Sequence, residues 1–130
     1  KTKQLVKKKR WFCYLVIEQH NKVLVRKRTA KDIWQNLHEF VLVETPQRMS
    51  PEKFLQARFY KQISRGNQFR VQSISGTYIQ QLSHQTIEGY FLYIRANKMP
   101  VIEGFEPVPV SRLPRLAFPR FISRYLAEKG

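Results

Sequence analysis

The stretch Trp11–Arg28, WFCYLVIEQHNKVLVRKR, decides the fold. Its first part, Trp11–Glu18, is rich in aromatic and β-branched residues, and its last part, Lys22–Arg28, alternates between apolar and polar side chains. The polar residues 19–21 separate the two parts, and this pattern is typical of a β-hairpin. We therefore expect two paired strands at the start of a largely β core.

Two helices are expected further along the chain. Ser50 suits an N-cap position ahead of Pro51, and apolar residues then recur at helical spacing until Gly66, which predicts the end of the helix. Pro119 starts a second helix near the carboxyl end. The apolar positions of this helix recur at helical intervals, at Phe121, Ile122, Tyr125 and Leu126.

Further strands are expected at residues 39–44, 68–74 and 86–95. Residues 101–110 contain Pro107 and Pro109, and proline has no amide hydrogen to donate to a sheet, so this segment is an edge strand or an extended loop. Together the elements predict a mixed α/β (α+β) fold with a mixed β-sheet core and two flanking helices.

Composition limits the function classes. The 130 residues favour one domain, and 42% hydrophobic residues with 13% aromatic residues favour a folded chain. No apolar run is long enough to cross a bilayer, and the single Cys13 excludes an intramolecular disulfide. With 24 Lys and Arg against 9 Asp and Glu, the net charge is +15, which points to a polyanion: DNA, RNA or an acidic membrane.

Four segments in order along the chain resemble one known family. Residues 32–44, DIWQNLHEFVLVE, resemble the G-(L/I)-W-x-x-L-x-E-F-P-x-x-E stretch in the C-terminal domain of MutY-type A/G-specific adenine glycosylases. The hairpin LVIEQHNKVLVRKR resembles the entry into that family's Nudix-like fold. QLSHQTIEGYFLYI resembles its (F/L)-(S/T)-H loop and following strand, and LPRLAFPRFISRYL resembles its last helix. The matches span residues 10–126.

Residues 1–9 are basic, and we expect them to form a linker or arm. The resemblance implies that residues 10–130 are a Nudix-like C-terminal lesion-recognition domain. Full enzymes of that family remove adenine mispaired with 8-oxoguanine in base-excision repair. By resemblance, the catalytic domain and its 4Fe–4S cluster lie upstream, and this chain has no catalytic residue, metal or cofactor of its own. The implied partners are double-stranded DNA containing 8-oxoguanine opposite adenine and the enzyme's own N-terminal catalytic domain.

Ser83 and His84 are the candidate lesion-recognition residues, together with Leu82. Oxidation of guanine at C8 turns N7 into an N–H donor and adds O8 as an acceptor. A Ser hydroxyl can both accept and donate, and a His ring can do either according to its tautomer. The resemblance implies that Ser83 and His84 sense this change, and Leu82 is a candidate wedge beside the lesion. The alternative is that these residues have only structural roles: Ser83 caps a turn, Leu82 packs in the core and His84 is an ordinary surface residue.

Other uses of these residues fit less well. Adjacent strand residues point to opposite faces, so Ser83 and His84 make a poor nucleophile and base, and no acid nearby in the sequence completes a triad. A Nudix hydrolase needs a glutamate-rich helix to hold divalent metal. Here, no Asp or Glu follows Glu52 until Glu88, and the intervening helix is basic.

Candidate phosphate contacts are basic residues near the hairpin exit and near Gly66. They are Arg26, Lys27, Arg28, Lys31, Arg65 and Arg70. Such contacts supply affinity and orientation rather than specificity.

Two functions are alternatives to the recognition of 8-oxoguanine. One is a diverged Nudix pyrophosphohydrolase, and the other is a double-stranded DNA-binding module without lesion preference. We expect a monomer that is located in the bacterial cytoplasm and associated with the nucleoid.

Overall fold

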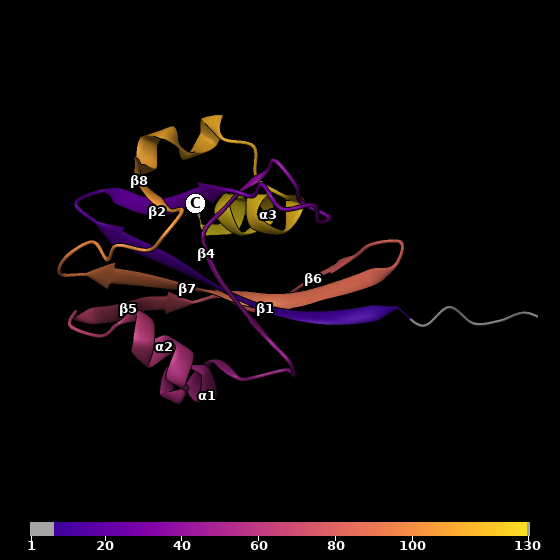
Figure 1. The fold of residues 1–130 in the computed structure, drawn as a ribbon, viewed down its shortest axis with the longest axis horizontal. Helices are drawn as coiled ribbons and strands as arrows, with labels where there is room; N and C mark the ends of the chain where they lie inside the picture. Colours follow the sequence, from indigo (N-terminus) through magenta and orange to yellow (C-terminus); the bar gives the residue numbers. More distant parts are fainter. Residues whose placement is uncertain (1–6, 130) are drawn as a thin grey trace, which may run out of the picture.

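Two helical layers enclose a mixed β-sheet in the computed structural model, which describes residues 7–129 (Figure 1). Helices α1 and α2 lie below the sheet in this view, and α3 lies above it with the 3₁₀ helix η1. The elements are β1 (Lys8–Gln19), β2 (Lys22–Lys27), β3 (His38–Glu39), β4 (Val41–Thr45), α1 (Pro51–Gln56), α2 (Arg58–Ile63), β5 (Phe69–Ile74), β6 (Tyr78–Gln81), β7 (Gln85–Ala96), β8 (Glu106–Pro109), η1 (Val110–Arg115) and α3 (Arg120–Lys129).

The two long strands β1 and β7 form the centre of the sheet. They run parallel, in register from Lys8 opposite Gln85 to Glu18 opposite Arg95. On its other edge, β1 pairs first with β4 and then with β2. Strand β7 likewise pairs first with β6 and then with β5. The expected hairpin is confirmed, with His20 and Asn21 at its two-residue turn in the left-handed backbone region.

Side chains of the central strands alternate between two cores, as a pleated sheet requires. Phe12, Tyr14 and Phe91 face α3, where the rings of Phe91 and Tyr125 stack at 4.1 Å between centroids. The intervening residues face α1 and α2. The central strands also approach closely, because a Cβ atom on Gly89 would lie 2.1 Å from the carbonyl oxygen of Phe12. Only glycine fits at this position of β7.

The expected helix from Ser50 to Gly66 is broken in two. The Ser50 side chain accepts a hydrogen bond from the amide of Lys53, as an N-cap does, but Ala57 is extended at φ −80° and ψ 157°. On a continuous helix, Phe54 and Tyr60 would point about 120° apart. The break at Ala57 lets both residues bury their rings in the same core.

The other expected elements are largely confirmed. The strand at residues 39–44 is present as β3 and β4, separated at Phe40, and the proline-containing segment forms an edge strand, β8. Helix α3 buries Phe121, Ile122 and Tyr125 as its spacing predicted. The mixed sheet with flanking helices therefore confirms the predicted fold class, while β6 and η1 were not predicted.

The start of β1 differs from the expected arm at residues 1–9. Residues 1–6 lie outside the described part of the chain, whereas Lys8 and Lys9 belong to β1. Their pairing with Gln85 and Thr86 extends the strand beyond the apolar run that marks it in the sequence. None of the helices in the described part has the length and apolar character needed to span a bilayer.

Candidate nucleic-acid interface

The turn Leu82–His84, named here the β6–β7 turn, joins two antiparallel strands at the end of the sheet where β1 begins (Figure 1). The amide of Leu82 donates to the carbonyl of Gln85 at 2.8 Å, which closes the turn. The amide of Lys8 donates to the carbonyl of His84 at 3.1 Å, which ties the turn to β1. Backbone bonds therefore hold this turn against two different strands.

The three side chains of the β6–β7 turn have different surroundings. Ser83 and His84 are exposed, so both can reach a ligand from solvent. Leu82 is half-buried and packs against the core cluster on the α3 side of the sheet. In this conformation, the Leu82 side chain anchors the turn by packing against the core. A role as a wedge between bases would require this side chain to leave the core.

Three consecutive lysines, Lys7–Lys9, lie beside this turn and are named here the basic edge. All three are exposed, and the parallel register places Lys8 opposite Gln85 and Lys9 opposite Thr86. Within residues 7–129, no carboxylate forms an ion pair with any of them. Their charges are available to an anionic ligand. Their basic sequence predicts an arm, and only the register reveals their proximity to Ser83 and His84.

Several arginines instead form ion pairs with carboxylates. Glu39 is fully buried and accepts hydrogen bonds from Tyr14 Oη at 3.1 Å, Arg26 Nε at 2.8 Å and Arg28 Nη1 at 2.7 Å. The Arg28 side chain is 10% exposed and also pairs with Asp32. Of the candidate phosphate contacts, Arg28 is thus enclosed in an ion-pair network, and Arg26 is partly committed to Glu39.

This network continues to the β6–β7 turn through Arg10. Arg10 donates from Nε and Nη2 to the Glu44 carboxylate, each at 2.8 Å, and from Nη1 to Asp32 at 3.4 Å and Gln85 Oε1 at 3.3 Å. The hydrogen bond to Glu44 raises the pKa of Arg10. Arg10 therefore stays charged and links the acidic loop residues to Gln85, the first residue after the turn.

The remaining candidate phosphate contacts lie in two different regions of the chain. Lys27 and Lys31 are exposed at and beyond the end of β2. Arg65 follows α2, and Arg70 lies opposite Arg95 near the far end of β7. From Gln85 to Ala96, β7 spans 11 residue steps, roughly 36 Å at 3.3 Å per residue. Arg65 and Arg70 are therefore distant from Ser83 and His84.

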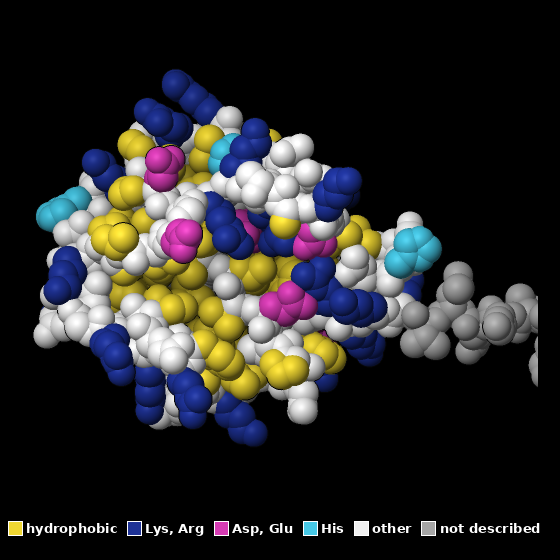
Figure 2. Space-filling view, viewed as in Figure 1, with side chains coloured by type: hydrophobic (Ala, Val, Ile, Leu, Met, Phe, Trp, Pro, Cys, Tyr) yellow, Lys and Arg dark blue, Asp and Glu magenta, His cyan; other side chains and the backbone are white. Residues whose placement is uncertain are grey.

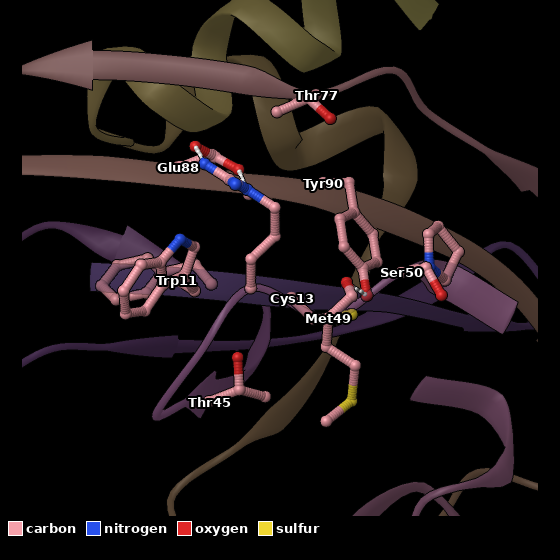
Figure 3. A pocket seen from close by; sticks show the side chains of 12 residues that line it. Trp11, Cys13, Thr45, Met49, Ser50, Thr77, Glu88 and Tyr90 are labelled. Carbon is pink, nitrogen blue, oxygen red and sulfur yellow. Dashed lines mark hydrogen bonds and ion pairs between the residues drawn. The ribbon is translucent and has the colours of Figure 1, made fainter. Parts of the chain in front are cut away.

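A small pocket lies between the central strands and the start of α1 (Figure 3). Its volume is about 170 Å³, and Trp11, Met49 and Tyr90 are among the residues that line it. Arg48 and Glu88 form an ion pair beside it, with N–O distances of 2.5 and 2.8 Å. The hydrogen bond from Arg48 lowers the pKa of Glu88, so this carboxylate is ionised and neutralised by Arg48.

The helical region that would hold a divalent metal in a Nudix hydrolase does not fit one here. Between Pro51 and Ile63, Glu52 is the only acid. The described residues contain no group of three or more His, Cys, Asp or Glu side chains with metal-binding spacing. Hard divalent cations require several oxygen ligands, so this donor set is insufficient. No chemical step is therefore assigned to a metal.

The chain belongs to the NUDIX domain family, whose model matches residues 13–128. Several solved structures have a similar fold. The E. coli ORF135 protein has a TM-score of 0.64 at 14% identity, covering 95% of this chain and 93% of that one. The MutT protein from Methanosarcina mazei Go1 has a TM-score of 0.62 at 16% identity, covering 97% of this chain and 99% of that one.

A MutT NUDIX hydrolase from Burkholderia pseudomallei has a TM-score of 0.62 at 11% identity, covering 94% of this chain and 98% of that one. At such identities, the likeness to these structures shows the fold alone. Among curated proteins, none matches the chain.

Proposed function

We propose that this Nudix domain recognises 8-oxoguanine in double-stranded DNA as the non-catalytic C-terminal part of a MutY-type adenine glycosylase. The observation that supports this most is the exposed Ser83–His84 pair, held by backbone hydrogen bonds beside the unpaired charges of the basic edge. The order of the four family-like segments along the chain supports the same proposal.

The chemistry of the pair suits the lesion. In 8-oxoguanine, N7 carries a hydrogen and O8 is a new acceptor. The Ser83 hydroxyl can accept from N7–H, and the hydroxyl or the His84 ring can donate to O8. With guanine, the Ser83 hydroxyl would have to donate to the bare N7 acceptor, and no O8 would remain to accept from the His84 ring. That unpaired donor would disfavour the undamaged base.

The basic edge would supply contacts to the phosphates on either side of the lesion. Lys7, Lys8 and Lys9 lie beside the β6–β7 turn, and the exposed Lys27 and Lys31 are further candidate contacts. These contacts carry affinity but no base specificity. Removal of the mispaired adenine requires a second, catalytic domain that flips this base out of the helix, and we propose that domain as a partner of this one.

A second candidate function is a diverged Nudix pyrophosphohydrolase, which membership of the NUDIX domain family favours. The shortage of acids in α1 and α2 opposes it. Incubation with 8-oxo-dGTP and Mg²⁺ tests this candidate. Metal-dependent release of pyrophosphate, lost on substitution of Glu52, would support a hydrolase and would remove the reason for calling the chain non-catalytic.

Equilibrium binding tests the lesion reader. Two fluorescent duplexes differ only in 8-oxoguanine or guanine opposite adenine, and anisotropy at moderate salt gives the affinity ratio between them. We expect the chain to favour the damaged duplex. Ser83→Ala with His84→Ala should bring the ratio toward one, while the control Lys27→Gln weakens both complexes equally. Equal binding of both duplexes by the unmodified chain would contradict lesion reading and leave a general DNA-binding module.

A further inference from the structure

The outer face of α2 forms a groove that carries only positive charge. Gln56, Arg58, Lys61, Gln62 and Arg65 line this groove, named here the α2 groove, which has a volume of about 690 Å³. All five residues are exposed. Arg58 and Lys61 are three residues apart on α2, which places their side chains on one helical face, and Arg65 follows the helix.

No acid neutralises this face. From Lys53 to Ile87, the chain contains five Lys or Arg residues and no Asp or Glu. All six ion pairs of the described residues involve Arg10, Arg26, Arg28 or Arg48, which lie elsewhere. In Figure 2, Lys and Arg side chains line the lower edge of the molecule, where Figure 1 shows α1 and α2. The cations of the α2 groove therefore form no ion pair within residues 7–129.

Helix stability does not explain the charge either. A cation at the first position of a helix opposes the helix dipole, which favours anions there. Helix α2 nevertheless begins with Arg58 and has no acid in its first turn. Its N-cap, Ala57, makes no side-chain hydrogen bond.

The α2 groove is separate from the β6–β7 turn. Tyr60 on α2 packs its ring 6.0 Å from that of Phe69, the first residue of β5. Phe69 pairs with Ala96, the last residue of β7, whereas the turn precedes the first residue of that strand. The turn therefore lies at the Gln85 end of β7, whereas α2 packs against the residue that pairs with the Ala96 end of this strand.

We propose that the α2 groove binds the phosphodiester backbone of nucleic acid, as a second contact surface independent of lesion reading. Three cations along one groove match a row of phosphates, and the two glutamine amides add hydrogen-bond donors. The groove contains no aromatic side chain among its lining residues, so it has no platform on which bases could stack. The contact is therefore expected to be independent of sequence and of damage.

Matched triple variants test this proposal on an undamaged duplex. Arg58→Gln, Lys61→Gln and Arg65→Gln are combined in one variant, and Lys22→Gln, Arg112→Gln and Arg115→Gln in a control with the same loss of charge. The control residues are exposed and lie in β2 and η1. Circular dichroism first establishes that both variants are folded.

The α2 variant should weaken duplex binding at least about tenfold at low salt and reduce the slope of log affinity against log salt by roughly 2 to 3. The control should change affinity by less than about twofold, because non-contacting charges release few counterions. Equal effects of the two variants, or no effect of the α2 variant, would overturn the proposal. Loss of binding to phosphatidylglycerol vesicles with unchanged duplex binding would assign the groove to a membrane surface instead.

This test of the α2 groove does not depend on whether the chain recognises 8-oxoguanine. The ratio of affinities for damaged and undamaged duplexes should be the same in the α2 variant and the unmodified chain. If the unmodified chain shows no lesion preference, the salt slopes on the undamaged duplex still decide the role of the α2 groove.

Discussion

The backbone amide of Lys8 donates to the carbonyl oxygen of His84 at 3.1 Å, so the first residue of β1 fixes the last residue of the β6–β7 turn. This bond joins two segments that are 76 positions apart in the sequence. It makes the basic edge and the Ser83–His84 pair one structural unit, since phosphate contacts from the lysines would also orient the turn.

Removing this hydrogen bond should loosen the turn. Lys8→Pro eliminates the amide hydrogen, whereas the control Lys8→Ala removes the charge and keeps the amide. We expect hydrogen exchange of the Ser83 and Gln85 amides to accelerate in Lys8→Pro alone, with a decrease of about 1 kcal/mol in the free energy of unfolding. Equal exchange rates in the two variants would show that the bond does not order the turn.

The buried carboxylate of Glu39 should contribute strongly to stability. Glu39→Gln leaves the enclosed Arg28 with Asp32 as its remaining charge partner, and breaking a buried pair in this way costs about 3 kcal/mol. The control Glu44→Gln, at a carboxylate whose side chain is 38% exposed, should cost below about 1 kcal/mol. Urea denaturation measures both. Similar costs for the two variants would contradict the assigned structural role of Glu39.

Gly89 should tolerate no larger residue. In Gly89→Ala the new methyl group would meet the Phe12 carbonyl at 2.1 Å, and this is a backbone atom that cannot move without separating β1 from β7. We expect a loss of about 3 kcal/mol or more. Gly76→Ala is a matched control, because nothing lies within 4 Å of its new Cβ, and it should stay within about 0.5 kcal/mol.

Acid should destabilise the chain through Glu88 and Asp32. The hydrogen bond from Arg48 lowers the pKa of Glu88. Burial acts to raise the pKa of Asp32, but the Ile33 amide and the charges of Arg10 and Arg28 outweigh it and lower this pKa overall.

Both groups therefore have a lower pKa in the folded chain than in the unfolded chain, where their ordinary values are 4.5 and 3.8. Their contribution to the free energy of unfolding is present above those values and is lost as the pH falls through the folded pKa. Urea denaturation from pH 6 to pH 3 measures this loss. Glu88→Gln should flatten the acid side of the curve, and an unchanged curve would contradict the assignment.

Local signals in the sequence were sufficient for much of the fold. The hairpin at residues 11–28, the Ser50 cap and the apolar positions of α3 each depend on neighbours within one element, so the pattern predicted them. Strand β6 was missed because its four residues are too few to establish a period. The break at Ala57 was missed because it follows from where Phe54 and Tyr60 must pack.

The candidate site divides in the same way. Ser83 and His84 were selected from a short motif, and the structure exposes both. Lys8 and Lys9 were assigned to an arm because their position beside the turn depends on the parallel register with β7. Arg26 and Arg28 were candidate phosphate contacts because their partner Glu39 lies on a different strand, and such pairing is invisible in a charge pattern.

The most direct test of lesion reading is an amide NMR titration of the chain with two duplexes at moderate salt. One carries 8-oxoguanine opposite adenine and the other is undamaged. Our account predicts shifts at Leu82, Ser83 and His84 with the damaged duplex alone, together with shifts at basic residues with both. Identical shifts with the two duplexes, confined to Lys and Arg positions, would contradict it.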